Sequence, residues 1–148
     1  MPIATSCHLA PDVKIPYPDL VNLYGCTIGS GVFVGPFVEI QKNATVGDGC
    51  RVQSHTFICE GVHIGQRVFI GHGVIFINDR NPKANNPDWV LEETFVEDDA
   101  SIGSGAIILC GLRLGAGCRI GCGAVVTRNV DPGETVVGIP AVPIVHRG

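Results

Sequence analysis

The fold is decided by one stretch, residues 28–76: IGSGVFVGPFVEIQKNATVGDGCRVQSHTFICEGVHIGQRVFIGHGVIF. It has a large apolar residue at every sixth position, and the same spacing returns from Val96 to Val126. Neither an α-helix nor an alternating strand has a period of six, whereas a parallel β-helix does. The large residues are Ile28, Val34, Ile40, Val46, Val52, Ile58, Ile64, Ile70 and Phe76, then Val96, Ile102, Ile108, Leu114, Ile120 and Val126.

A second series of mostly small residues follows four positions behind the large ones. Residues two apart in a strand face the same side, so each unit of six predicts a short strand and a corner. Glycines such as Gly47 and Gly49 stand in register, where corners need unusual backbone angles. We therefore predict one all-β domain over residues 1–148, with about six or seven triangular coils stacked about 4.8 Å apart. Residues 132–148 are expected to form a C-terminal cap.

The same phase extends backward through Ile3, Leu9 and Ile15. One inserted residue after Ile15 would make Asn22 the next inward position, six before Ile28. Four of the seven cysteines fall on the small inward positions, where they would act as small apolar residues: Cys7, Cys26, Cys50 and Cys118.

Composition excludes several classes of function. A net charge of −4 with 16% charged residues provides no basic stripe for nucleic acid. No apolar run is long enough to span a membrane, and no signal peptide opens the chain. The cysteine count is odd and no pair has the C-x-x-C spacing of a metal site. A reducing cytoplasm is expected, with no nucleic-acid or membrane partner.

The repeat is interrupted once. The step from Phe76 to Val96 is 20 residues instead of six, and the insert is rich in Asn and Pro. It predicts an external loop near residues 78–95. Long loops in compact domains are usually functional, although a tolerated surface insertion is the alternative. Trp89 in this loop is expected to pack on a neighbouring subunit or a ligand.

Polar residues gather just before the loop. Residues about 18 apart stack on successive coils, so His55 and His72 should share one face, and Glu60 and Asn78 should form a column on the next. We expect both columns to flank one prism edge beside the root of the loop, and His63 to lie at another corner. The gathered residues are Gln53, Ser54, His55, Glu60, His72, Asn78, Asp79 and Arg80.

The repeats resemble those of hexapeptide acyltransferases. The stretch from Val68 to Lys83 is similar to a segment of bacterial nucleotide-sugar N-acetyltransferases, which acetylate a 3-amino group on UDP- or dTDP-linked sugars. Ile77 stands where that family usually has Thr, and His72 stands where several members have Pro. The resemblance implies a left-handed β-helix, acetyl-CoA as co-substrate, and a homotrimer with active sites between subunits.

The resemblance also implies roles for residues. Asn78 would accept a hydrogen bond from the acceptor amine. His72 or His55 would accept its proton, or the departing thiolate of coenzyme A would do so. Substrate-binding candidates are Gln53, Glu60, Asp79 and Arg80. Small residues would let coenzyme A approach and cations would meet its phosphates: Ser104, Gly105, Cys122 and Gly123, with Lys83, Arg113, Arg119 and Arg128.

Three other functions fit the repeat. An O-acetyltransferase acting on a sugar or serine hydroxyl would need His55 or His72 as a strong base. A γ-class carbonic anhydrase would need three zinc-binding histidines, but the pair of histidines five apart that is typical of that class is missing. No metal is therefore expected. A non-catalytic scaffold would explain the coils but not the polar cluster.

Overall fold

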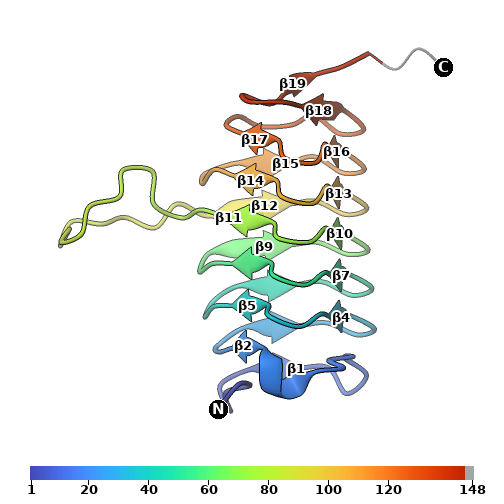
Figure 1. Cartoon of the computed structure of the whole chain (residues 1–148), viewed down its shortest axis with the longest axis vertical. Coiled ribbons are helices and arrows are strands. Elements are labelled where there is room, and N and C mark those ends of the chain that lie inside the picture. The colour runs from blue at the N-terminus through green and yellow to red at the C-terminus, as the bar shows by residue number, and fades with distance from the viewer. Residues whose placement is uncertain (146–148) are drawn as a thin grey trace.

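The computed structural model describes residues 1–145. The chain winds into a triangular prism whose three faces are β-sheets of six, seven and six strands (Figure 1). Sheet A consists of β2 (Asn22–Leu23), β5 (Glu39–Ile40), β8 (Phe57–Ile58), β11 (Ile75–Phe76), β14 (Ile107–Ile108) and β17 (Val125–Val126). Sheet B consists of β1 (His8–Leu9), β3 (Thr27–Ile28), β6 (Thr45–Val46), β9 (Val62–Ile64), β12 (Thr94–Val96) and β15 (Arg113–Leu114). Sheet C consists of β4 (Phe33–Val34), β7 (Arg51–Val52), β10 (Phe69–Ile70), β13 (Ser101–Ile102), β16 (Arg119–Ile120), β18 (Thr135–Val137) and β19 (Val142–Pro143).

The strand register confirms the sequence period. Val46 pairs with Ile64 on the next coil, 18 residues further on. Across the interruption Ile70 pairs with Ile102, so the chain makes a 32-residue excursion and returns in register. The pairs are parallel, except that β18 and β19 are antiparallel. The all-β architecture of about seven coils agrees with the predicted left-handed β-helix.

The interior is filled as the two apolar series predict. Ile102 and Leu114 of the large series have no exposed surface, and neither do Val32 and Ala44 of the second. Thr56 is the polar member of the second series, and its hydroxyl donates to the Gly71 carbonyl at 2.8 Å. A buried hydroxyl is tolerated when it is hydrogen-bonded in this way.

The predicted phase is wrong at the N-terminus. Leu23, rather than Asn22, points inward and is fully buried, while Asn22 is exposed. Leu23 pairs with Ile40, 17 residues further on. A short 3₁₀ helix, η1 (Pro18–Leu20), occupies the corner before β2. Because it takes up a different number of residues from the usual corner, the phase shifts by one.

The insertion leaves the prism between β11 and β12 and projects far from it as an external loop, residues 77–93 (Figure 1). Thr94 and Phe95 were expected in the loop but belong to β12. At the other end, β18 and β19 form the described part of the C-terminal cap; residues 146–148 of the predicted cap lie outside the described residues. No helix among residues 1–145 is long and apolar enough to cross a membrane.

The inward cysteines behave as small apolar side chains. Cys26, Cys50 and Cys118 are buried, and Cys7 is partly buried with its Sγ 3.7 Å from that of Cys26. Burial raises the pKa of Cys26 to about 12 and that of Cys118 to about 11. These thiols therefore stay protonated near neutral pH, which makes them poor nucleophiles.

Candidate active site

Two edges of the prism border sheet A, and they carry the predicted site residues. The histidine edge, between sheets C and A, is a column of two-residue corners held by backbone hydrogen bonds. The N–H groups of Gly73, Gly105 and Gly123 each donate to the preceding corner at 2.8–2.9 Å. The corners are Pro36–Phe37, Ser54–His55, His72–Gly73, Ser104–Gly105 and Cys122–Gly123.

The loop edge, between sheets A and B, is the second column. It carries Glu60 and Asn78 on successive coils, and the external loop leaves the prism directly after Asn78. The later corners are Cys110–Gly111 and Arg128–Asn129. Asp79, Arg80 and Lys83 belong to the loop, and Arg128 lies at the far end of the same edge.

The two predicted columns therefore do not flank one edge. His72 ends the histidine-edge corner that precedes β11, and Asn78 follows β11, so a strand of sheet A separates them. The prediction placed them together because it fixed which residues stack but not which corner each column occupies. Within one chain the candidate residues form two groups at opposite margins of the same face.

Asn78 is held with its amide group oriented. Its Nδ2 donates to the backbone carbonyl of Glu60 at 3.1 Å. No hydrogen bond to its Oδ1 is found among residues 1–145, so this oxygen is available to accept one. Glu60 itself is tied on both sides, because its N–H donates to Gln41 Oε1 at 3.1 Å and its Oε1 accepts from Asn43 at 3.3 Å.

His72 has a hydroxyl partner on the next coil. Its backbone N–H donates to Ser104 Oγ at 3.1 Å, and the same oxygen lies 3.4 Å from His72 Nδ1. When Nδ1 carries the imidazole proton toward this oxygen, Nε2 presents a lone pair. Cys122 is exposed on the following corner of the same edge. His72, Ser104, Gly105, Cys122 and Gly123 are thus brought together as the sequence predicted.

His55 lies one coil toward the N-terminus and contacts an aromatic ring that the sequence analysis missed. Its imidazole and the Phe37 ring have centroids 4.9 Å apart at an interplanar angle of 33°. Gln53 precedes this corner, in a column otherwise made of glycines, and its side chain is partly exposed. The spacing of 18 could have pointed to Phe37, because it is one coil before His55.

The neck of the external loop is pinned to the loop edge. The guanidinium of Arg80 donates to both carboxylate oxygens of Glu92 at 3.2–3.3 Å and to the Cys110 carbonyl at 2.9 Å. Leu91 packs so closely on Gly61 that a Cβ there would lie 3.0 Å from it. Arg80, predicted to bind substrate, is therefore occupied in holding the loop. The hydrogen bond from Arg80 lowers the pKa of Glu92 below its ordinary value.

We expect this neck to loosen in acid. A carboxylate whose pKa is lowered in the folded state adds stability above its ordinary pKa of 4.5, and that stability is lost as the pH falls through the lowered value. Hydrogen exchange followed by mass spectrometry, corrected for intrinsic rates, should show the peptide spanning residues 77–93 losing protection below about pH 4. Glu92→Gln should weaken this pH dependence, and Asp88→Asn at the loop tip should keep it. An unchanged dependence in Glu92→Gln would contradict the assignment.

The loop also encloses a small hollow of about 270 Å³. Trp89 forms part of its wall and is 39% exposed. Asp79 lies at one end, where its Oδ1 accepts from the Asn81 N–H at 3.1 Å. Lys83 is exposed on the loop, away from the prism and from Ser104.

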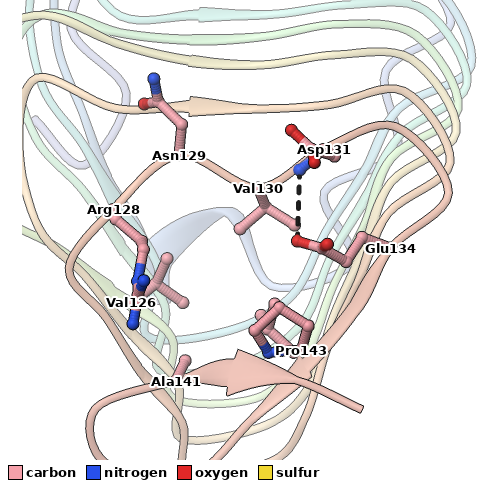
Figure 2. A pocket seen from close by; sticks show the side chains of 9 residues that line it. Val126, Arg128, Asn129, Val130, Asp131, Glu134, Ala141 and Pro143 are labelled. Atoms are coloured by element: carbon pink, nitrogen blue, oxygen red, sulfur yellow. Dashed lines mark hydrogen bonds between the residues drawn. The ribbon is translucent and has the colours of Figure 1, made fainter. Parts of the chain in front are cut away.

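A second hollow, of about 200 Å³, lies at the C-terminal end of the prism (Figure 2). Arg128 lines it together with Val126, Asn129, Asp131 and Glu134. Arg128 is thus separated by sheet A from Ser104 and Cys122, with which the sequence analysis grouped it. The two cationic candidates Lys83 and Arg128 both lie on the loop-edge side of the chain.

His63 is not at a corner. It belongs to β9 and points outward from sheet B, where its Nδ1 lies 3.0 Å from Thr45 Oγ1 and its ring stacks on Phe95. A polar network near the start of sheet A was also missed. There the Glu39 carboxylate accepts from Asn22 and Gln41 at 3.0 Å and from the Tyr24 hydroxyl at 3.4 Å. The misphased Asn22 concealed this cluster.

No three His, Cys, Asp or Glu side chains gather closely enough to hold a metal ion anywhere in residues 1–145. The polar groups of the two edges are instead amides, imidazoles and hydroxyls. Such groups suit hydrogen bonding to an organic substrate.

Comparison with known proteins supports the repeat assignment. Residues 25–60 and 93–128 match the family described as bacterial transferase hexapeptide (six repeats). Both segments are bacterial transferase hexapeptide repeats. A curated relative, the bifunctional protein GlmU from Thermotoga sp. (strain RQ2), is 37% identical over 115 residues. That alignment covers 78% of this hexapeptide-repeat chain and 24% of GlmU, so the chain spans about a quarter of the curated relatives it matches.

Solved structures share the hexapeptide-repeat fold. A hexapeptide-repeat acetyltransferase from Vibrio cholerae O1 biovar eltor, complexed with acetyl coenzyme A, superposes with a TM-score of 0.74 at 23% identity. The match covers 81% of this chain and 69% of that one. PerB from Caulobacter crescentus, in complex with CoA and GDP-perosamine, gives 0.68 at 21% identity over 96% of this chain and 56% of that one.

Proposed function

We propose that the chain is an acetyl-CoA-dependent N-acetyltransferase that acts on the amino group of a nucleotide-linked amino sugar. Such a reaction would serve the synthesis of surface polysaccharides or other glycans in the cytoplasm. The observation that carries the proposal is the oriented amide of Asn78 at the root of the loop. The bound acetyl-CoA of the Vibrio cholerae neighbour and the CoA and GDP-perosamine of PerB support it.

Asn78 suits the first task of the reaction, which is to hold a neutral amine in line with the thioester carbonyl. Because its Nδ2 is engaged by the Glu60 carbonyl, its Oδ1 faces outward and accepts a hydrogen bond from the amine. An acceptor of this kind positions the nucleophile without protonating it. Positioning alone lowers the barrier of a bimolecular reaction substantially.

His72 would take the proton that the amine loses when it attacks. An imidazole has its ordinary pKa near neutrality, so its neutral form is available as a base. The Ser104 oxygen beside Nδ1 favours the tautomer that leaves Nε2 free. The acetyl C–S bond then breaks, and the proton passes to the departing coenzyme A thiolate. An N–H at a glycine corner would stabilise the oxyanion.

Coenzyme A would follow the histidine edge from His72 toward the C-terminal coils. Gly105 and Gly123 have positive φ angles and no side chain there, and a Cβ at Gly123 would meet no neighbour. These corners leave the backbone open to close approach. The cations proposed for its phosphates, Lys83 and Arg128, would come from the loop edge of a neighbouring subunit.

A homotrimer would unite the two edges. The outward side chains of sheet A form an apolar stripe along several coils: Phe57, Ile75, Ile107 and Val125. Ile75 is 43% exposed, and burial of such a stripe favours association. If three copies turned sheet A toward a common axis, the histidine edge of each would meet the loop edge of the next. His72 of one copy would then approach Asn78 of another.

An O-acetyltransferase is the second candidate, because the pairing of His72 with Ser104 suits activation of a hydroxyl. A hydroxyl needs a stronger base than an amine, so His72 would then be indispensable. The oriented Asn78 oxygen favours the amine, since a hydroxyl acceptor needs its proton removed by a base.

The test is acetyl-CoA turnover with UDP-, dTDP- and GDP-linked amino sugars, each paired with its hydroxyl analogue. We expect at least one amino sugar to give an N-acetyl product by mass spectrometry and NMR. His72→Ala should lower kcat less than Asn78→Ala. Turnover of hydroxyl analogues alone, abolished in His72→Ala, would replace the proposal with the second candidate.

A further inference from the structure

Phe37 occupies a backbone conformation that is unusual for its residue type. Its φ is 60°, and that of His55 on the next coil is 64°. The equivalent corners further along the histidine edge have Gly73, Gly105 and Gly123, which adopt this conformation without strain. A bulky residue with positive φ is an outlier. Such residues persist at sites where the strain has a use.

The strained corner presents an exposed aromatic surface. Phe37 is 55% exposed although its ring packs on the His55 imidazole. On the N-terminal side its N–H donates to the Leu20 carbonyl at 2.7 Å, and Leu20 is 44% exposed. Packing of the core does not require Phe37, because the inward position of this coil is filled by Val38.

We propose that the Phe37–His55 pair is the stacking platform for the nucleobase of the acceptor. This inference rests on the proposed function and names the part of the substrate that the N-terminal coils recognise. If acetyl transfer occurs at His72 and coenzyme A extends toward Cys122, the acceptor must extend the other way. That direction leads along the same edge to His55 and then Phe37.

The chemistry of the platform fits a planar base. Aromatic rings stack on bases of any sequence, because each base has a π-face. Gln53 lies beside the platform and offers both a donor and an acceptor to a base edge. Arg51, on the adjoining strand β7, brings a cation to the same coil and stacks over Phe33 at 4.1 Å. A guanidinium suits the phosphates that follow the base. His55 is accordingly a binding residue rather than the base.

Binding of UDP, dTDP and GDP by isothermal titration calorimetry tests the platform without requiring turnover. We expect wild type to bind at least one of them, Phe37→Ala to bind it about tenfold more weakly, and Phe37→Trp to retain binding. Phe69→Ala is the matched control, because Phe69 is 40% exposed but lies on strand β10 of sheet C. It should bind the nucleotide as wild type does.

Kinetics distinguish the nucleobase from the adenine of coenzyme A. Phe37→Ala should raise KM for the nucleotide-linked amino sugar about tenfold, and leave unchanged the KM for acetyl-CoA and the parameters for the amino sugar 1-phosphate. A raised KM for acetyl-CoA, an equal effect on the 1-phosphate, or a changed oligomeric state would overturn the inference. Phe37-dependent nucleotide binding without any N-acetylation would support the platform and refute the proposed reaction. N-acetylation that is indifferent to Phe37 would do the reverse.

Discussion

Asn78→Ala is expected to lower kcat/KM for the amino-sugar acceptor about 100-fold while the chain stays folded. The substitution removes the Oδ1 acceptor and the Nδ2 donor that orients it on the Glu60 carbonyl. A misplaced amine loses the advantage of being aligned with the thioester, so the loss should fall mainly on kcat. Steady-state rates of coenzyme A release, measured over a range of acceptor concentrations, provide the test.

Two companions make the result specific. Asn78→Asp keeps an acceptor but places an oxygen against the Glu60 carbonyl, so it should be nearly as impaired as alanine. Asn85→Ala changes an exposed asparagine in the same loop region and should behave as wild type. Full activity in Asn78→Ala, with unchanged thermal unfolding, would remove Asn78 from the site.

Ile102→Ala is expected to have the largest effect on stability. Ile102 is fully buried and lies on β13, the first strand of sheet C after the loop excursion. Truncating a buried isoleucine costs about 2–5 kcal/mol of unfolding free energy, because the cavity only partly collapses. For a chain of this size Tm should fall by about 10 °C. Differential scanning calorimetry measures the shift directly.

The matched control is the neighbour on the same strand. Ser101 points outward from sheet C and is exposed, so Ser101→Ala should change Tm by little. Comparable shifts in the two variants would mean that the inward and outward assignments of β13 are wrong. They would contradict the interpretation of the six-residue period as well.

The period predicted the core because burial of one residue in six is a repeated, local constraint. Every coil from Ile28 onward obeys it, and the 32-residue excursion leaves the register intact. The N-terminal phase failed because η1 replaces a standard corner. A 3₁₀ turn of uncertain length cannot be inferred from a pattern that counts residues.

The site was predictable only in part. Stacking on successive coils gave the column that contains His72 and Ser104, and the one that contains Glu60 and Asn78. It did not show that a face of the prism lies between them, because a step of six residues moves to the next corner. Contacts such as Arg80 with the Cys110 carbonyl depend on where the loop neck folds back, which no repeat encodes.

Active-site complementation tests most directly the claim that the two edges of sheet A, from neighbouring copies, make one site. His72→Ala and Asn78→Ala chains are mixed in equal amounts, unfolded, refolded together and assayed for N-acetylation. In a ring of three, about one site in four then combines an intact His72 from one copy with an intact Asn78 from the next. We predict about a quarter of wild-type activity from two variants that are each impaired. Activity no higher than the mean of the separate variants would contradict a shared site.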